Sequence, residues 1–166
     1  MSYALCCSKE EMTAIAGREF GLGAGGRCCG ESVLTAACAA LGVTAPEIVP
    51  SIALGFGGGV GLTGRLCGSF SAAIMAIGIA TGKTIADYGE RKGETFRRAA
   101  DFLRKCAEKR GGAVDCKALC GLDLTTEAGM DKLVNGGVKD EICLPLVKET
   151  AGMLYDELLR IRNGTP

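Results

Sequence analysis

A long, nearly uncharged segment in the middle of the chain most constrains how it folds. Residues 31–80 contain only three charged side chains, Glu31, Glu47 and Arg65, whereas residues 83–110 contain nine basic and five acidic ones. Apolar surface is stabilised by leaving water, so a segment this poor in charge is expected to be covered by the rest of the chain. We therefore expect the middle of the chain to form the core and the charged flanks to face water.

Helix signals run through almost the whole chain, and the alternating pattern of a half-buried strand is scarce. Ser8 and Glu11 form a capping box for a first helix that ends in the glycines of residues 21–26. Further helices are expected over residues 29–41, from Thr44 and Pro46 to residue 54, over 68–79, over 93–109, in short pieces from about Asp115 and Thr125, and over 143–161. The chain is therefore predicted to be all-α, a compact multi-helix bundle.

Two segments that contain glycine are expected to form a loop and the central helix of this bundle. The run at residues 55–64 has six glycines, whose backbone entropy cost excludes a stable helix or strand interior, so it is expected to be a loop or a tight backbone crossing. The next segment, residues 66–82, is 17 residues long and uncharged, at the short limit for a membrane-spanning helix. Its alanine-rich surface, with no second span in the charged half, favours a buried central helix, and no membrane span is expected.

Length, charge and the first residues narrow the class of protein. A chain of 166 residues suits one domain, here residues 1–166. The charges of its 19 basic and 19 acidic side chains sum to zero, so the net charge does not indicate binding to nucleic acid or anionic lipid. The start of the sequence lacks the basic and apolar pattern of an export signal, from which we expect a cytoplasmic protein. The sequence gives no indication of an oligomeric state.

Ten cysteines and no histidine define the chemistry open to this chain. Without imidazole it has no Ser–His or Cys–His nucleophile, no metal site built on histidine and no Cys-X-X-Cys-His haem attachment. Thiols in the cytoplasm are mostly kept reduced, so a cysteine-rich cytoplasmic chain is more often metal-binding or redox-active than held by structural disulfides. Sulfur is therefore expected to carry whatever chemistry the site performs.

Four cysteines lie at or within one turn of a predicted helix start: Cys29, Cys67, Cys116 and Cys143. Cys116 follows Asp115, a favourable N-cap residue. Free N–H groups and the positive end of the helix dipole stabilise a thiolate there, and any anionic cluster that thiolates ligate. We expect these four helix starts to converge on a thiolate-lined pocket in which the thiol pKa values are lowered.

Four of the remaining cysteines are weaker candidates. Cys38 and Cys106 lie on the apolar faces of their helices and are expected to be core residues. Cys6 and Cys7 lie in a terminal segment that we expect to be mobile. These four are left outside the predicted site.

Two further cysteines adjoin the predicted site residues. Cys28 precedes Cys29, and Cys120 lies one turn beyond Cys116. Either could replace its neighbour as a ligand or resolve a disulfide. No Cys-X-X-Cys pair occurs, and zinc-ribbon and bacterial ferredoxin spacings are missing, so a site would be assembled from distant segments. The alternative is a set of mostly buried thiols with no common site.

Several segments of the chain resemble those of a known family. They are Arg27-Cys-Cys-Gly-Glu-Ser-Val-Leu34, the glycine run at 55–61, Gly64-Arg-Leu-Cys-Gly-Ser-Phe-Ser-Ala-Ala-Ile-Met75, Cys116 and Cys143. Together they resemble the redox-active proteins of the C_GCAxxG_C_C family over about residues 25–160. The four characteristic cysteines of that family fall here on Cys29, Cys67, Cys116 and Cys143. Its Cys-Gly-Ala-x-x-Gly motif reads Cys67-Gly-Ser-Phe-Ser-Ala72, with serine for alanine and alanine for glycine.

The resemblance implies a redox function, and the likeness of this family to domains of split-Soret cytochromes implies an iron–sulfur centre. The leading hypothesis is that the four cysteines ligate one [2Fe–2S] or [4Fe–4S] cluster, since both take four thiolates, and that the protein transfers electrons. Backbone N–H groups of residues 55–64 would then approach the cluster sulfurs and tune its potential. Two alternatives stay open: a thiol–disulfide oxidoreductase that uses two of these cysteines, and a structural zinc site with all four.

A redox protein needs a partner protein, and the sequence does not identify it. Six basic residues in and just after the helix expected over 93–109 could dock an acidic redox partner: Arg97, Arg98, Arg104, Lys105, Lys109 and Arg110. The same pattern is typical of the solvated face of an amphipathic helix, and we favour that interpretation.

Overall fold

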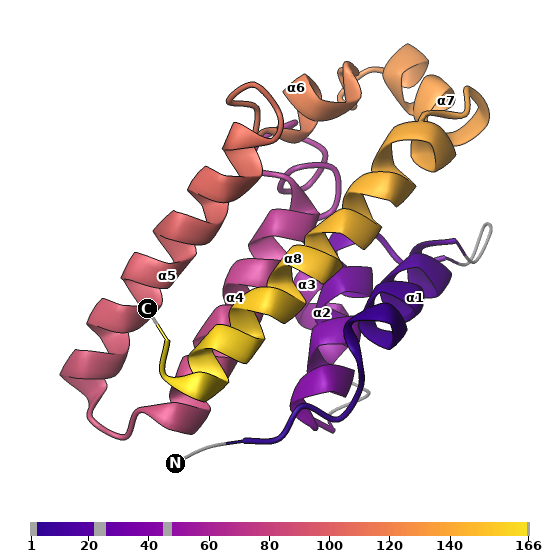
Figure 1. Cartoon of the computed structure of the whole chain (residues 1–166). Helices are drawn as coiled ribbons and strands as arrows, with labels where there is room; N and C mark the ends of the chain where they lie inside the picture. The colour runs from indigo at the N-terminus through magenta and orange to yellow at the C-terminus, as the bar shows by residue number, and fades with distance from the viewer. Residues whose placement is uncertain (1–2, 22–25, 45–47, 166) are drawn as a thin grey trace.

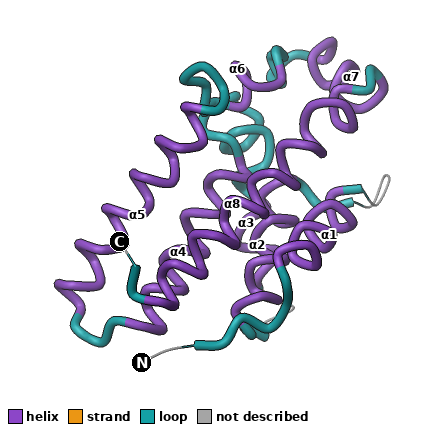
Figure 2. Tube along the Cα trace, viewed as in Figure 1, coloured by secondary structure: helices purple, strands orange, loops and turns teal. Residues whose placement is uncertain are grey.

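The computed structural model describes residues 3–21, 26–44 and 48–165, which fold into a bundle of helices (Figure 1). Its elements are α1 (Lys9–Phe20), α2 (Cys29–Leu41), α3 (Val49–Leu54), α4 (Gly68–Thr84), α5 (Tyr88–Glu108), α6 (Cys116–Cys120), α7 (Glu127–Asn135), the π-helical turn η2 (Lys139–Cys143) and α8 (Leu144–Asn163). Figure 2 shows helices joined by loops, and one isolated antiparallel bridge pairs Leu66 with Asp115. The prediction of an all-α fold is confirmed.

α4 is the central helix of the bundle. It packs against α2, α5 and α8, and Figure 1 shows α8 crossing in front of it. Ten of its 17 residues are buried. Its buried face combines the fully buried Phe70 and Ile77 with four alanines, whose small side chains let the neighbouring helices approach closely. The predicted buried central helix is thus confirmed, and no helix among the described residues is long and apolar enough to cross a membrane.

Two of the helices extend by about one turn beyond their predicted bounds. α4 continues to Thr84, past the predicted end at residue 79. α5 begins at Tyr88 and not at residue 93, because Asp87 caps it and its carboxylate accepts a hydrogen bond from the Glu90 N–H at 2.8 Å. α2 has the predicted bounds, and Gly42 ends it in the left-handed conformation of a C-cap (φ 63°).

The third helix begins later than predicted. Pro46 lies outside the described residues, and α3 starts at Val49 with Pro50 in its first turn, where the missing N–H of proline has no helical partner to lose. The two short helices predicted next are present as α6, whose N-cap is Asp115, and α7, whose N-cap is Thr126. The last predicted helix is present as α8, which η2 precedes.

The segment before α1 is anchored to the bundle, contrary to the expectation that it is mobile. The Cys6 N–H donates a hydrogen bond to the Ala40 carbonyl of α2 (2.8 Å). The Tyr3 hydroxyl donates one to the Leu158 carbonyl of α8 (2.6 Å). These two bonds tie the segment to two different helices.

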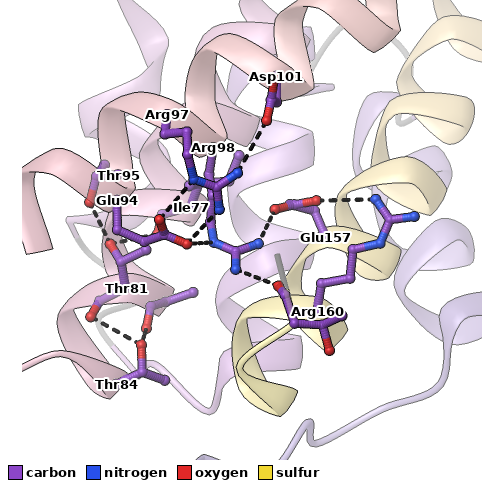
Figure 3. A network of polar contacts seen from close by, with 12 residues as sticks. Ile77, Thr81, Thr84, Glu94, Thr95, Arg97, Arg98, Asp101, Glu157 and Arg160 are labelled. Carbon is purple, nitrogen blue, oxygen red and sulfur yellow. Dashed lines mark hydrogen bonds and ion pairs between the residues drawn. The ribbon is translucent and has the colours of Figure 1, made fainter.

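A buried arginine joins α5 to α8 and to the chain beyond it (Figure 3). The Arg98 side chain is 5% exposed and donates hydrogen bonds to the carboxylates of Glu94 and Glu157, each at 2.6 Å. A third hydrogen bond goes to the Thr165 carbonyl (2.6 Å). The interpretation of Arg98 as a solvated or docking cation is therefore wrong, because α8 covers it and supplies the acid that neutralises it.

The other five basic residues of this group also pair with acids. Each lies within 3.9 Å of a carboxylate: Arg97 with Glu94 and Asp101, Arg104 with Asp101 and Glu108, Lys105 with Glu157, and Lys109 and Arg110 with Glu149. Exposed pairs of this kind contribute little to stability, and they leave little unpaired positive charge for a partner. The favoured interpretation, a solvated helix face, suits Arg97, Arg104, Lys105 and Lys109 better than a docking site. Arg110 does not fit it, because it follows α5 and its side chain is only 12% exposed.

Candidate functional site

The glycine-rich segment holds the start of α4 beside the start of α6. The Cys67 N–H donates a hydrogen bond to the Val114 carbonyl (3.0 Å). The Cys116 N–H donates one to the Arg65 carbonyl (2.7 Å). These two bonds cross between segments that are distant in the sequence, and they bring Cys67 and Cys116 to the same end of the bundle.

Two glycines allow the backbone to approach the cysteines. Gly59 has a left-handed backbone (φ 73°), and a Cβ on it would overlap the Arg65 carbonyl oxygen and lie 2.7 Å from the Cys116 Cβ. A Cβ on Gly68 would lie 2.8 Å from the Cys29 sulfur. Side chains do not pack this closely, so both positions require glycine.

Two bulky residues of the same loop also have left-handed backbones. Val60 has a φ of 61° and Leu62 a φ of 67°, values that are costly for residues with a Cβ and most of all for a β-branched one. Hydrogen bonds within the loop hold this conformation, among them one from the Gly61 N–H to the Gly55 carbonyl (2.9 Å). The loop therefore has a defined conformation that keeps Val60 and Leu62 partly exposed.

Five cysteines line one small cavity of about 30 Å³. Cys29 is the first residue of α2, Cys67 is the N-cap of α4, Cys116 is the first residue of α6 and Cys143 directly precedes α8. The fifth, Cys120, ends α6. Four other residues complete the wall: Ser69, Leu119, Ile142 and Leu146. The structure thus brings together all four predicted site cysteines, and it adds Cys120.

The cavity lies where two hydrophobic cores meet. Cys67 belongs to the main core, against which Cys29 packs. Cys120 belongs to a smaller core, against which Cys116 packs. Cys143 packs against both cores, so the site joins the two parts of the molecule through sulfur.

The neighbouring thiols of Cys29 and Cys67 shift each other's pKa in opposite directions. The Cys29 thiol lowers the pKa of Cys67 below the ordinary thiol value, and the Ser69 N–H lowers it further. The Cys67 thiol, together with burial, raises the pKa of Cys29 well above that value. Within this pair Cys67 therefore ionises more readily than Cys29.

The expected lowering of the thiol pKa values is wrong for the other site cysteines. Burial raises the pKa of Cys143 to about 12, and the sulfurs of Cys29 and Cys120 raise it further. Burial and the same two neighbours also raise the pKa of Cys116. Cys143 has no free helix end beside it, because the first backbone N–H of α8 already donates to a carbonyl of η2. Burial and neighbouring sulfurs therefore outweigh the position at a helix start.

A larger pocket of about 400 Å³ adjoins the cavity. Cys29, Cys116 and Cys143 line both spaces. The walls of the pocket are mostly apolar, formed by Phe20, Leu54, Leu62, Leu124, Leu133 and Val134. Lys139 also lines it, with its Nζ 5.1 Å from the centre of the Phe20 ring. Pockets of this size and lining are typical of small-molecule and cofactor sites.

The remaining cysteines lie away from the small cavity. Cys38 and Cys106 are 3% and 0% exposed in the main core, as predicted. Cys28 is the N-cap of α2 and lines the larger pocket, where its sulfur lies 3.9 Å from the Ala53 carbonyl oxygen.

A known family shares these features. The sequence profile described as "Putative redox-active protein (C_GCAxxG_C_C)" matches residues 27–157. The chain belongs to this family. The matched region contains all five cysteines of the cavity and the whole glycine-rich segment, and it confirms the resemblance seen in the sequence. No curated protein and no solved structure shows a significant match to the chain.

The donor atoms of this family member suit a thiolate-bound metal centre. The cavity offers five sulfurs and no carboxylate, a soft donor set that suits iron–sulfur clusters and zinc. As the side chains stand, no three Cys, Asp or Glu groups within residues 3–21, 26–44 and 48–165 are placed to hold a metal ion. The small cavity has room for about one or two water molecules, whereas the adjoining pocket of about 400 Å³ has room for a cluster. The donor atoms of the site therefore suit a thiolate-bound iron–sulfur cluster or zinc, and the adjoining pocket offers the space for a cluster.

Two residues of the cavity wall were missed or ranked low from the sequence. Cys120 lies one turn beyond Cys116, and this spacing indicates that the two side chains share a helix face. Ser69 had a weaker signal, a serine in place of the alanine of the family motif two residues after Cys67. Neither signal alone indicates that the side chain faces a cavity.

Proposed function

We propose that the cysteine cavity binds one iron–sulfur cluster, of the [2Fe–2S] or [4Fe–4S] type, and that the protein transfers electrons to or from a redox partner. Cys29, Cys67, Cys116 and Cys143 are the ligands in this proposal. The observation that carries it is the convergence of these four cysteines, from four separate helix starts, on a cavity without a carboxylate. Four thiolates are the number of ligands that either cluster type takes. When bound, the cluster supplies a centre that gains and releases single electrons.

The residues of the chain would hold and shield this group. Three of the four thiols also line the larger pocket, which offers the volume that the cavity lacks. Gly59 and Gly68 keep the backbone close to Cys116 and Cys29, where N–H dipoles stabilise negative charge on sulfur. Apolar walls such as Leu124 exclude water and limit solvation of the charge.

Replacing the ligands one at a time tests this proposal. After purification and reconstitution without oxygen, we expect alanine at Cys29, Cys67, Cys116 or Cys143 to remove most of the bound iron. Cys106→Ala is the matched control, because Cys106 is fully buried in the main core and does not line the cavity. Retention of iron by all four single variants would refute the ligand assignment.

One pair of thiols favours a second function, thiol–disulfide exchange. The Cys67 thiolate would attack a disulfide substrate, form a mixed disulfide and release one substrate thiolate. Cys29, after losing its proton to water, would attack the Cys67 sulfur, form the Cys29–Cys67 disulfide and release the second thiolate. The substrate thereby gains the two electrons that the dithiol loses. Both thiols line the small cavity, and the pKa of Cys67, the attacking thiol, is the lowered one of the two.

Redox titration with alkylation of free thiols tests the second function. The loss of two thiols per chain, and their location at Cys29 and Cys67 by mass spectrometry, would support it. A constant thiol count from about −320 to −180 mV would exclude it, since exchange partners operate in that range. Zinc bound at one atom per chain without redox change would indicate a structural site.

A further inference from the structure

We propose that the Ser69 hydroxyl donates a hydrogen bond to sulfur in the cysteine cavity and thereby raises the reduction potential of the site. This role rests on the proposed redox function and adds a positioning residue to it. Ser69 lies in the first turn of α4, two residues after Cys67, and lines the cavity. Its side chain is fully buried, and its oxygen has no hydrogen-bond partner with normal geometry among the described residues.

An unpartnered hydroxyl in the interior is unusual because its desolvation is not compensated. Other buried hydroxyls of the bundle bond to the carbonyl one turn earlier: Ser71 to Cys67, Thr81 to Ile77 and Thr150 to Leu146. Ser69 has no helical carbonyl at that distance, because α4 begins at Gly68. The Arg65 carbonyl, four residues earlier, accepts the Cys116 N–H at 2.7 Å and no bond from the Ser69 hydroxyl. The hydroxyl is therefore left to the cavity.

The acceptors that the cavity offers to this hydroxyl are sulfur atoms. Apart from Ser69 and the five cysteines, the wall consists of Leu119, Ile142 and Leu146, whose side chains accept no hydrogen bond. A sulfur that carries negative charge accepts a hydroxyl hydrogen bond more strongly than a neutral thiol does. The Ser69 hydroxyl therefore donates its strongest hydrogen bond when a sulfur of the site carries negative charge.

The direction of the effect follows from the charge of each redox state. The reduced form of a cluster carries one more electron than its oxidised form, and a dithiol can carry thiolate charge that a disulfide lacks. A donated hydrogen bond stabilises the reduced form more in both couples, and so it raises the midpoint potential. Removal of the hydroxyl should therefore lower that potential.

The test compares the wild type with Ser69→Ala and Ser71→Ala. Ser71 is the matched control, because it is a buried serine of the same helix whose hydroxyl already donates to the Cys67 carbonyl (3.3 Å). Iron content is measured first, on protein handled without oxygen. If iron is bound, the centre is titrated by its visible spectrum. If none is bound, the Cys29–Cys67 dithiol is titrated against glutathione, so an iron-free wild type refutes the cluster and Ser69 is still tested.

We expect Ser69→Ala to shift the equilibrium toward the oxidised form by about three- to tenfold at a fixed potential, the effect of one hydrogen bond. Ser71→Ala should stay within about twofold of the wild type on the same measure. The thermal midpoint of the oxidised, metal-free Ser69→Ala protein, in which the Cys29–Cys67 disulfide carries no thiolate charge, should equal or exceed that of the wild type. This result separates tuning of the potential from a structural role. An unchanged potential in Ser69→Ala, an equal shift in Ser71→Ala, or a wild type with neither redox couple would overturn the proposal.

Discussion

The Cys29 thiol, at the start of α2, and the Cys67 thiol, at the start of α4, line the same small cavity. Each shifts the pKa of the other, so that the pKa of Cys67 is lowered and that of Cys29 is raised. Cys67 is therefore more acidic than Cys29, Cys116 and Cys143, and burial keeps Cys116 and Cys143 protonated to high pH. In the metal-free protein, the sulfurs of one cavity therefore differ widely in reactivity.

The first prediction concerns the ionisation of Cys67. In the reduced, metal-free protein we expect Cys67 to ionise below the ordinary thiol pKa, and Cys29→Ala to move that step to higher pH because the thiol that lowers the Cys67 pKa is lost. Thiolate absorbance at 240 nm across pH 6–10 measures it. Cys106→Ala is the control, because burial raises the pKa of Cys106 to about 11. Identical titrations of wild type and Cys29→Ala would contradict this effect of Cys29.

The second prediction concerns the glycine-rich loop. Gly59→Ala should lower the free energy of unfolding by about 2 kcal/mol or more, since the new Cβ meets the Arg65 carbonyl and Cys116 in a left-handed backbone. Gly61→Ala is the matched control, because Gly61 has a φ of 61° but open space around it. It should cost about 1–2 kcal/mol, the left-handed penalty alone. Urea denaturation of both variants checks the difference, and an equal loss would show that the close approach to Cys116 is not limiting.

The third prediction concerns the ion pair between α5 and α8. Glu157→Gln should destabilise the protein by about 3 kcal/mol, because it leaves the buried Arg98 guanidinium without its α8 acid. Asp101→Asn removes an exposed partner of Arg97 and should cost less than about 1 kcal/mol. Chemical denaturation at low and high salt compares the two. A salt-sensitive loss of similar size in both variants would show that Glu157 acts as a surface charge.

The fourth prediction concerns stability at alkaline pH. Burial raises the pKa of Tyr3 to about 12, above the ordinary tyrosine value of 10.0. Below pH 10 the phenol is protonated in the folded and the unfolded chain, so its bond to Leu158 contributes fully. Between pH 10 and about 12 the unfolded chain alone releases the proton, so this contribution falls as the pH rises.

Tyr3→Phe tests this dependence. It should be less stable than the wild type by about 1 kcal/mol at pH 8, and the difference should shrink as the pH rises above 10. Tyr88→Phe is the control, because Tyr88 is 69% exposed. Urea midpoints at pH 8 and pH 11 provide the measurement. A difference that stays constant with pH would refute the role of Tyr3.

Local sequence patterns predicted most of the helices because these depend on neighbouring residues. Gly42 and Asp115 marked a helix end and a helix start correctly, through a left-handed C-cap and an N-cap. The start of α5 lies before the predicted one because Asp87 caps the helix and Gly93 lies inside it. A glycine inside a helix lowers its stability but does not end it when the cap and the packing are favourable.

The site could be predicted only in part, because its chemistry depends on contacts between distant segments. Helix starts identified Cys29, Cys67, Cys116 and Cys143, and the structure brings these four together. Their pKa directions could not be predicted, since burial and neighbouring sulfurs act only after α2, α4 and α6 have packed. The burial of Arg98 was missed for the same reason, because Glu157 lies on another helix.

Analysis of iron and acid-labile sulfide, with a visible spectrum of protein purified without oxygen, tests the proposed cluster most directly. We expect iron and sulfide in near-equal amounts and a charge-transfer absorption that gives the protein a brown colour. Loss of the iron from the alanine variants would then identify the ligands, which we expect to be Cys29, Cys67, Cys116 and Cys143. A colourless protein without iron after anaerobic reconstitution, or one that holds only zinc, would contradict the proposal.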